Sequence, residues 1–426
     1  MSNYEQLLAI LRSQVKPALG CTEPGAVAYA VARAKELLGG DVKELKIRVD
    51  KNILKNGMDV GIPGTDERGI VFAAALSLVV GKAEYGLEVL RDVTAASIEA
   101  ARELVEAKII KLELEEETNG LYICVDAIGE RDRSRVIIKD SHTNIVFESR
   151  NDEVLLDREQ AGTGTAAEPE DSKQAIKNYS FAELIAFARN IPLEELAFIQ
   201  DGIDMNMRIA RANLAENPGI GIGKHFYDQA RDVFELAKAY TAAASEARMS
   251  GYPLPVMSSA GSGNHGLVAI IPIAVVGAEK GLAREQILRA VTLSHLITIY
   301  VKAYTGPLSP VCGCGIAAGV GCAAGLTYLL GGDSDQIVAA VNNMVAGLTG
   351  MLCDGAKLGC SYKLSIAVDA AMDAANLALK NITIPPDNGI LGQTAEETVQ
   401  NMALVSRVGM NNTDSVILDV MLQKCL

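Results

Sequence analysis

The sequence has no tryptophan and few other aromatic residues, which limits how its core is built. Only 7 phenylalanines and 12 tyrosines occur among 426 residues, whereas 49% of the chain is hydrophobic and 39 residues are glycine. A chain of this length and composition buries a large core and folds as a globular protein rather than remaining disordered. Because bulky rings are scarce, we expect that core to consist of helices packed closely on small side chains.

Basic residues are also in short supply. Lys and Arg number 39 against 53 Asp and Glu, which gives a formal net charge of −14. Nucleic acids and anionic membranes bind positive surfaces, so we expect neither as a partner. The first 16 residues lack the apolar run of a signal peptide, which favours a cytoplasmic location. Thiols stay reduced there, and clustered cysteines then indicate metal binding or catalysis more often than disulfides.

Hydrophobic periodicity divides the chain into two parts and predicts an α+β protein. Residues 1–171 predict an N-terminal α/β domain with an antiparallel sheet, in which Thr118-Asn-Gly forms a hairpin turn. Residues 157–171 are polar and aperiodic, as in a linker. Residues 172–426 predict an all-helical C-terminal domain. The expected strands are residues 44–50, 108–115, 121–128, 135–139 and 144–149, and the expected helices include residues 69–80, 83–107 and 225–250.

Cys21 stands immediately before a predicted helix that has Pro24 in its first turn. The unpaired amides at a helix N-terminus carry partial positive charge, which stabilises a thiolate and lowers the thiol pKa. Cys21 is therefore a candidate base or nucleophile. The alternative is a small, buried residue at the start of the helix, and position alone does not decide between the two.

A glycine-rich segment, SSAGSGNHG at residues 258–266, is the first candidate ligand-binding loop. Glycine allows the backbone to approach a ligand closely, and successive amides in such a loop suit a carboxylate. Ser259, Ser262, Asn264 and His265 add side-chain donors. The segment lacks the lysine of a phosphate-binding loop, and an ordinary turn between helices is the alternative.

A second segment, residues 55–69, begins with the polar pair Lys55 and Asn56 and continues with several glycines and a proline. This composition predicts a loop. Its first two side chains could reach a ligand, and a plain turn without a binding role is the alternative.

Five of the eight cysteines fall between positions 312 and 360. Residues 303–332 contain no charge and are rich in glycine, which favours a buried packing region over a membrane span. The spacings Cys312-Gly-Cys314 and Cys353-x6-Cys360 do not match structural zinc sites. Iron–sulfur clusters accept such separations, and a cluster bound by three thiolates keeps one iron open to a substrate. Buried structural cysteines are the alternative.

Five motifs in a fixed order resemble the L-cysteine desulfidase family, which is related to the iron–sulfur L-serine dehydratases and their serine dehydratase-like alpha chain. The motifs are GCTEP at 20–24, KNGMDVGIPGT at 55–65, SAGSGNHG at 259–266, LSHLITIYVKAYTGPLSPVCGCGIAAG at 293–319 and MLCDGAKLGC at 351–360. They span essentially the whole chain. The resemblance implies a lyase that contains a [4Fe–4S] cluster, works without pyridoxal phosphate, and converts L-cysteine to sulfide, ammonia and pyruvate.

The resemblance also implies roles for residues in the matching motifs. Cys312, Cys353 and Cys360 correspond to the three cluster ligands, with Cys314 as an alternative to Cys312. Cys21 corresponds to the base that removes the Cα proton. The substrate carboxylate is then expected near Ser259, Ser262, Asn264 and His265, and near Lys55 and Asn56.

Two other functions are compatible with these residues. L-Serine ammonia-lyase activity would use the same site with hydroxide as the leaving group, and a non-catalytic metal-binding protein would leave Cys21 structural. The expected partner is a small amino-acid substrate, and a homo-oligomer is compatible with the sequence. Some serine dehydratases bring a C-terminal cysteine into the active site, and Cys425 is the corresponding candidate here.

Overall fold

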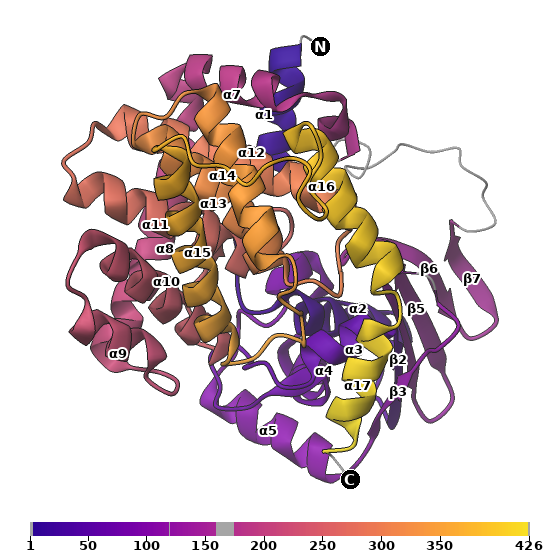
Figure 1. Cartoon of the computed structure of the whole chain (residues 1–426). Coiled ribbons are helices and arrows are strands. Elements are labelled where there is room, and N and C mark those ends of the chain that lie inside the picture. Colours follow the sequence, from indigo (N-terminus) through magenta and orange to yellow (C-terminus); the bar gives the residue numbers. More distant parts are fainter. Residues whose placement is uncertain (1–2, 119, 159–173, 425–426) are drawn as a thin grey trace.

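The computed structural model describes residues 3–118, 120–158 and 174–424 and contains an α/β part beside a helical part (Figure 1). The expected α+β class is confirmed. The predicted linker, beyond Arg158, and Cys425 lie outside the described residues. The first part contains α1 (Asn3–Gln14), β1 (Pro17–Ala18), α2 (Thr22–Leu38), β2 (Glu44–Val49), α3 (Lys51–Gly57), α4 (Gly69–Val80), η1 (Ala83–Glu88), α5 (Ala95–Glu106), β3 (Ile110–Leu114), β4 (Tyr122–Ile128), β5 (Arg133–Lys139), β6 (Ile145–Arg150) and β7 (Glu153–Asp157).

A six-stranded sheet in the order β3-β2-β4-β5-β6-β7 is the centre of the α/β part. Its strands pair antiparallel, as expected, except that β2 and β3 run parallel. Alternate residues of the central strands, such as Ile123 and Val125, are fully buried and share a core with α2 and α4. One face of the sheet therefore supports the helix that begins beside Cys21.

Three local predictions in this part are wrong. Thr118-Asn-Gly does not close a hairpin, because β2 lies between β3 and β4. The expected helix 83–107 is divided into η1 and α5, because Thr94 starts a new helix by accepting the amide of Ser97. The segment that begins at Lys55 is not wholly a loop, because Lys55 and Asn56 belong to α3. Asp50 starts that helix by accepting the amides of Asn52 and Ile53.

The helical part surrounds three buried helices, α11, α12 and α13. The expected helix 225–250 is interrupted, because Asp232 caps a new helix, α10, after α9 ends. The part also contains one short strand, β8. Its elements are η2 (Ile176–Asn178), α7 (Phe181–Asn190), η3 (Leu193–Leu196), α8 (Ala197–Glu216), α9 (Ile222–Gln229), α10 (Val233–Met249), β8 (Val256–Met257), α11 (Gly263–Glu279), α12 (Arg284–Thr305), η4 (Cys314–Ala318), α13 (Gly319–Leu329), α14 (Ser334–Leu348), α15 (Cys360–Ala378), α16 (Ala395–Leu404), η5 (Val405–Gly409) and α17 (Thr413–Leu422).

The two ends of the chain cross between the parts. Helix α1, at the N-terminus, buries Leu7, Ile10 and Leu11 in the core of the helical part. Helix α17, near the C-terminus, packs on α3 and places Leu418 in the core of the α/β part (Figure 1). Strand β1 also pairs with β8. Helices near both ends of the chain, together with the β1–β8 pair, therefore connect the two parts.

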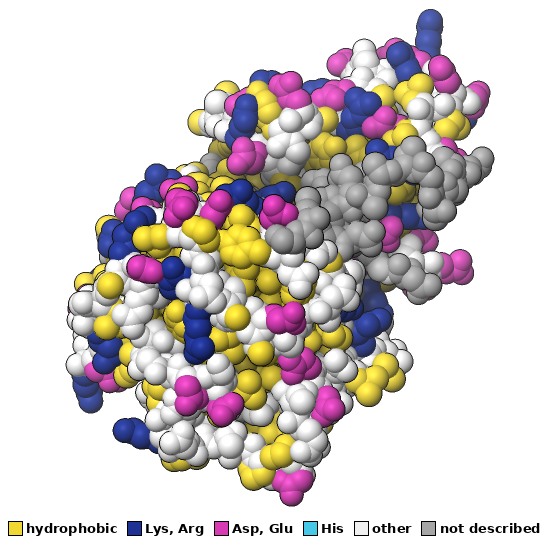
Figure 2. All heavy atoms as spheres, turned by 90° about the horizontal axis from the view of Figure 1, so that it is seen from above, with side chains coloured by type: hydrophobic (Ala, Val, Ile, Leu, Met, Phe, Trp, Pro, Cys, Tyr) yellow, Lys and Arg dark blue, Asp and Glu magenta, His cyan; other side chains and the backbone are white. Residues whose placement is uncertain are grey.

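Surface charge is mixed rather than segregated over the described residues that face the viewer in Figure 2, where Lys and Arg alternate with Asp and Glu. None of the helices within the described residues is both long and apolar enough to cross a membrane.

Glu246 connects α10 to the start of α9, and its loss should weaken the helical part. The carboxylate is fully buried and accepts the amides of Ile220, Gly221, Ile222 and Gly223 at 2.7–3.1 Å. Glu246→Ala should lower the free energy of unfolding by roughly 2–4 kcal/mol, because it removes the acceptor of four amides. Urea unfolding followed by circular dichroism measures this loss. Glu99→Ala on the exposed face of α5 is the control, and equal midpoints for the two variants would contradict the prediction.

Candidate functional site

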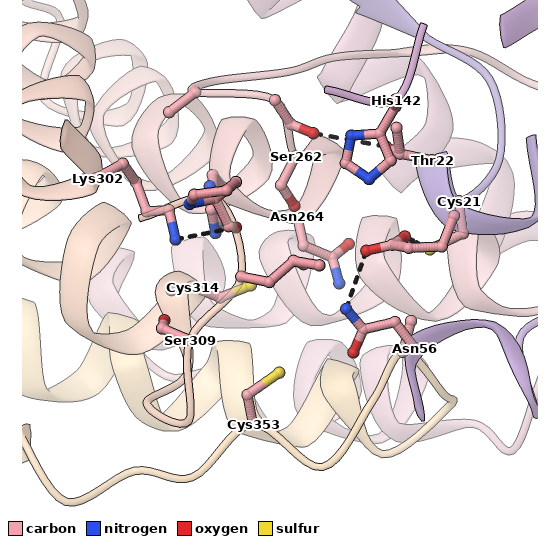
Figure 3. Close-up of a pocket in the computed structure, with 18 of the residues that line it drawn as sticks. Cys21, Thr22, Asn56, His142, Ser262, Asn264, Lys302, Ser309, Cys314 and Cys353 are labelled. Carbon is pink, nitrogen blue, oxygen red and sulfur yellow. Dashed lines mark hydrogen bonds between the residues drawn. The ribbon is translucent and has the colours of Figure 1, made fainter. Parts of the chain in front are cut away.

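A cavity of about 540 Å³ lies where the α/β part meets the helical part (Figure 3). Segments from the whole length of the chain contribute to its wall. In Figure 3, Cys314 and Cys21 lie on different sides of this space. The cavity is lined by, among others, Cys21, Glu23, Lys55, Asn56, His142, Arg248, Ser262, Asn264, His265, Lys302, Cys312, Cys314, Cys353 and Cys360.

Backbone pairing brings Cys312 and Cys353 together across a long separation in sequence. Val311 and Leu352 form an antiparallel bridge. The amide of Cys312 donates to the carbonyl oxygen of Met351, and the amide of Cys353 donates to that of Pro310, both at 2.7 Å. Because these bonds align the two segments, both side chains reach the same cavity.

The other thiols of the cluster differ in their surroundings. Cys360 begins α15, and its Sγ lies 3.6 Å from the carbonyl oxygen of Gly355. A hydrogen bond from Cys314 lowers the pKa of the Cys312 thiol, while the same bond and burial raise that of Cys314. Cys322 is fully buried in the α13 core and does not line the cavity.

Thiols of the cysteine segments line the cavity and could hold an iron–sulfur cluster. Within residues 3–118, 120–158 and 174–424, no three Cys, His, Asp or Glu side chains converge closely enough to hold one ion. A cluster places each thiolate on a different iron, so its ligands are spread around a larger space. Burial and the neighbouring Cys312 raise the pKa of Cys353, and the cations Lys55 and Lys363 offset this only in part. An all-sulfur donor set around a cavity is therefore suited to such a group.

Cys21 occupies the expected place before α2, but its electrostatic environment is the reverse of the prediction. The thiol is 8% exposed and donates a hydrogen bond of 3.1 Å to Oε2 of Glu23. Burial and the negative charge of Glu23 raise the pKa of Cys21 well above its usual value. The expectation of a thiolate near neutral pH is therefore wrong, because desolvation and a carboxylate outweigh the helix terminus.

Glu23, which the sequence reasoning did not single out, is the partner of both Cys21 and Asn56. Asn56 Nδ2 donates to Oε1 of Glu23 at 2.9 Å. Burial alone would raise the pKa of the Glu23 carboxyl. His142 and the hydrogen bonds from Cys21 and Asn56 outweigh that effect, so the pKa lies below its usual value. Glu23 lies within the GCTEP motif, but nothing in the spacing of that motif indicated a functional role for it.

The glycine-rich segment 258–266 forms a bend that leads directly into α11. Ser262, Asn264 and His265 line the cavity, whereas Ser259 lies behind it. Ser259 Oγ is 2.9 Å from Nδ1 of His295, and its carbonyl oxygen accepts from Nδ1 of His265 at 3.2 Å. Ser259 therefore orients His265 rather than facing the cavity.

His265 in turn lies close to the cysteine segment. A Cβ on Gly313 would come within 2.4 Å of Nε2 of His265, so only glycine fits between Cys312 and Cys314 without a shift. The Cys312-Gly-Cys314 spacing thus has a steric reason in addition to any ligand role.

The cavity wall is basic although the protein is acidic. Lys55, Arg158, Arg248 and Lys302 line it against two carboxylates, Glu23 and Asp140. Arg248 and Lys302 are buried and come from α10 and α12. Neither was predicted, because Arg248 sits inside a helical pattern with no motif and Lys302, although it lies in the 293–319 motif, was assigned no role. Lys55 is paired with Asp414, so it is the charge of Arg248 and Lys302 that suits a substrate carboxylate.

Arg248 also fixes the residues around it. Its Nη1 donates to Oδ1 of Asn264 at 3.0 Å, and its Nη2 donates to the carbonyl oxygen of Gly20 at 2.7 Å. The guanidinium therefore joins α10 and α11 to the segment that carries Cys21.

Lys55 has a structural task that the sequence did not reveal. Its side chain is 1% exposed, and its Nζ lies 2.5 Å from Oδ1 of Asp414 and 3.1 Å from the carbonyl oxygen of Cys353. Gly355, with φ of 90°, allows the cysteine loop to approach the backbone of Lys55. One ammonium thus joins α3, the Cys353 loop and α17.

Known proteins are similar to this chain along essentially its whole length. A family model described as the serine dehydratase alpha chain matches residues 84–419. The chain is 57% identical over 418 residues to a UPF0597 protein of Caldanaerobacter subterraneus, with 98% of each chain covered. It is 52% identical to a UPF0597 protein of Clostridium tetani, covering 100% of both, and 41% identical to one of Clostridioides difficile, covering 97% and 98%.

The buried ion pair between Lys55 and Asp414 should contribute strongly to the stability of the junction between the two parts. Lys55→Met leaves the Asp414 carboxylate buried without its cation and should lower the free energy of unfolding by roughly 3–5 kcal/mol. Lys55→Met/Asp414→Leu removes both charges and should recover part of this loss. Lys82→Met, in the exposed pair with Asp92, is the control. Urea unfolding measures all four proteins, and a double variant no more stable than Lys55→Met would contradict the account.

Proposed function

The chain belongs to the serine dehydratase alpha chain family, a family of lyases, and we propose that it is an L-cysteine desulfidase, the group that its five ordered motifs resemble. The proposed reaction is a β-elimination that yields sulfide, ammonia and pyruvate without pyridoxal phosphate. One observation carries the proposal: thiols from separate segments line one cavity with the buried pair Cys21 and Glu23.

Cys312, Cys353 and Cys360 would hold a [4Fe–4S] cluster, with Cys314 as the alternative to Cys312. When bound, such a cluster supplies a Lewis-acidic iron that can stabilise a departing sulfur. The proposal draws on the all-thiol donor set and on the cations Lys55 and Lys363 beside it. These cations offset part of the burial that raises the pKa of Cys353.

The chain's own residues would bind and orient the substrate. Arg248 and Lys302 offer positive charge to its carboxylate, and Ser262, Asn264 and His265 offer polar contacts from the start of α11. Fixing the carboxylate stabilises the negative charge that develops as the Cα proton leaves. Asn56 contributes indirectly in this scheme, because its amide holds Glu23.

The residues on the Cys21 side of the cavity would remove the Cα proton of the substrate. Loss of the Cα proton and of the β-substituent gives aminoacrylate, which leaves the site and hydrolyses to pyruvate and ammonia. The location of the enzyme is proposed to be the cytoplasm, in keeping with reduced thiols.

L-Serine ammonia-lyase activity is the second candidate, because the matching family model is described as a serine dehydratase alpha chain. The same cavity would serve, with hydroxide leaving in place of sulfide. We favour cysteine because sulfur binds iron strongly and because Cys21-Thr22 stands where the serine dehydratases have a His-Thr motif.

Anaerobic assays of the reconstituted protein decide between these substrates. L-Cysteine should yield sulfide and pyruvate in equal amounts, with a kcat/KM at least about ten-fold above that for L-serine. Pyruvate from L-serine alone would overturn the desulfidase assignment. Absence of turnover with either amino acid, in protein that contains its cluster, would favour a binding function.

Cysteine variants test the proposed ligands separately. Cys312→Ser, Cys353→Ser and Cys360→Ser should each lose most of the bound iron and the visible absorbance after anaerobic reconstitution, because each removes one of three thiolates. Cys322→Ser is the matched control, since Cys322 lies in the α13 core, and it should retain both signals. Loss of iron in Cys314→Ser together with retention in Cys312→Ser would reverse that one assignment. Full iron content in Cys353→Ser or Cys360→Ser would contradict the ligand set.

A further inference from the structure

The contact between Cys21 and Glu23 raises a question about the base. A protonated thiol can accept a second proton only if it gives up its own, either before that transfer or during it. Cys21 and the neighbouring carboxylate of Glu23 are each 8% exposed. Its Sγ donates to Oε2 of Glu23 at 3.1 Å, so the resting pair is a thiol bonded to a carboxylate. Both residues line the cavity.

We infer that Cys21 and Glu23 act as a two-residue proton relay, in which Glu23 accepts the thiol proton of Cys21 while Cys21 accepts the Cα proton. This inference rests on the proposed β-elimination and adds a residue to it. Glu23 acts through Cys21, so it is a positioning and proton-accepting partner rather than a group that touches the substrate.

The relay balances protons and electron pairs. The Cα–H bond breaks as a new S–H bond forms at Cys21, and the original S–H bond breaks as an O–H bond forms at Oε2 of Glu23. The electron pair left on Cα forms the Cα–Cβ double bond, and the sulfur leaves Cβ with the pair of the broken C–S bond. The Glu23 proton returns to solvent or product at the end of the cycle, which restores the carboxylate.

The geometry of Glu23 suits this task. Asn56 Nδ2 holds Oε1 at 2.9 Å, which leaves Oε2 directed at Cys21. Since Asn56 belongs to α3 and Glu23 to α2, two helices of the α/β part fix the carboxylate. A side chain that served only to fill space would not need both oxygens paired in this way.

The charges around the pair come from several elements. His142, in the turn between β5 and β6, lowers the pKa of Glu23, and Arg248 of α10 lowers that of Cys21, although burial and Glu23 dominate there. Asp50, which caps α3, is a further carboxylate whose own pKa is raised chiefly by burial and also by Glu23. Glu23 therefore remains ionised near neutral pH and Cys21 remains protonated.

Glu23→Gln separates the relay from simpler roles through two readouts. The first is the pH dependence of iodoacetamide alkylation at Cys21, followed on its peptide by mass spectrometry. Removing the Glu23 charge lowers the thiol pKa, so the alkylation midpoint should shift to lower pH and the rate at pH 7.5 should rise at least about three-fold. The second is kcat, which should fall by about 100-fold or more because the proton acceptor is gone.

In Glu23→Gln, alkylation of Cys21 should become faster while kcat falls. If Cys21 acted alone as a thiolate, both alkylation and turnover would rise in Glu23→Gln, and this outcome would overturn the relay. If Glu23 were only structural, both would fall or stay unchanged, which would also overturn it. Glu23→Asp, which keeps the charge, should keep the slow alkylation and recover part of the lost turnover.

One variant serves as the control, and one measurement on the wild-type protein tests the proposed function itself. Glu36→Gln removes a carboxylate from the exposed face of the same helix α2 and should match wild type in both readouts. Wild-type protein that turns over L-cysteine, together with unchanged alkylation in Glu23→Gln, would overturn the relay alone. Wild-type protein with its cluster but without turnover of L-cysteine or L-serine would overturn the proposed function, and the relay with it.

Discussion

The buried contact of Lys55 is the interaction on which the site depends most. Its ammonium reaches the carboxylate of Asp414 and the carbonyl oxygen of Cys353, so α3, the cysteine loop and α17 meet at one charge. A buried cation requires such partners, since it cannot remain desolvated alone. This contact joins the α/β part to two segments of the helical part, and the cavity lies where these parts meet.

Burial opposes ionisation at most of the thiols around the cavity. It raises the pKa of Cys353 and Cys360 as it raises that of Cys21, and Lys55 and Lys363 offset this only in part at Cys353. A hydrogen bond from Cys314 lowers the pKa of Cys312. Cys21 differs from these thiols in its partner, because it donates its hydrogen bond to the carboxylate of Glu23.

Sequence patterns predicted what depends on local periodicity. Helix α4 was expected at residues 69–80 and is found as Gly69–Val80, and the expected strands correspond to β2 to β6. The motifs also indicated the family and most of the residues that line the cavity. Contacts between distant segments could not be predicted in this way. The Lys55–Asp414 pair spans 359 positions, and the pKa of Cys21 depends on burial and on the orientation of Glu23, neither of which has a signature in a single sequence.

The proposed site has an iron for the substrate sulfur and a separate proton acceptor, both facing one cavity. Mössbauer spectroscopy of protein reconstituted anaerobically with ⁵⁷Fe, before and after addition of L-cysteine, examines the iron itself. We expect a [4Fe–4S] spectrum in which one iron changes its signal on addition of L-cysteine while the other three keep theirs. A spectrum without a four-iron cluster, or one that L-cysteine leaves unchanged, would show that the proposed site is wrong.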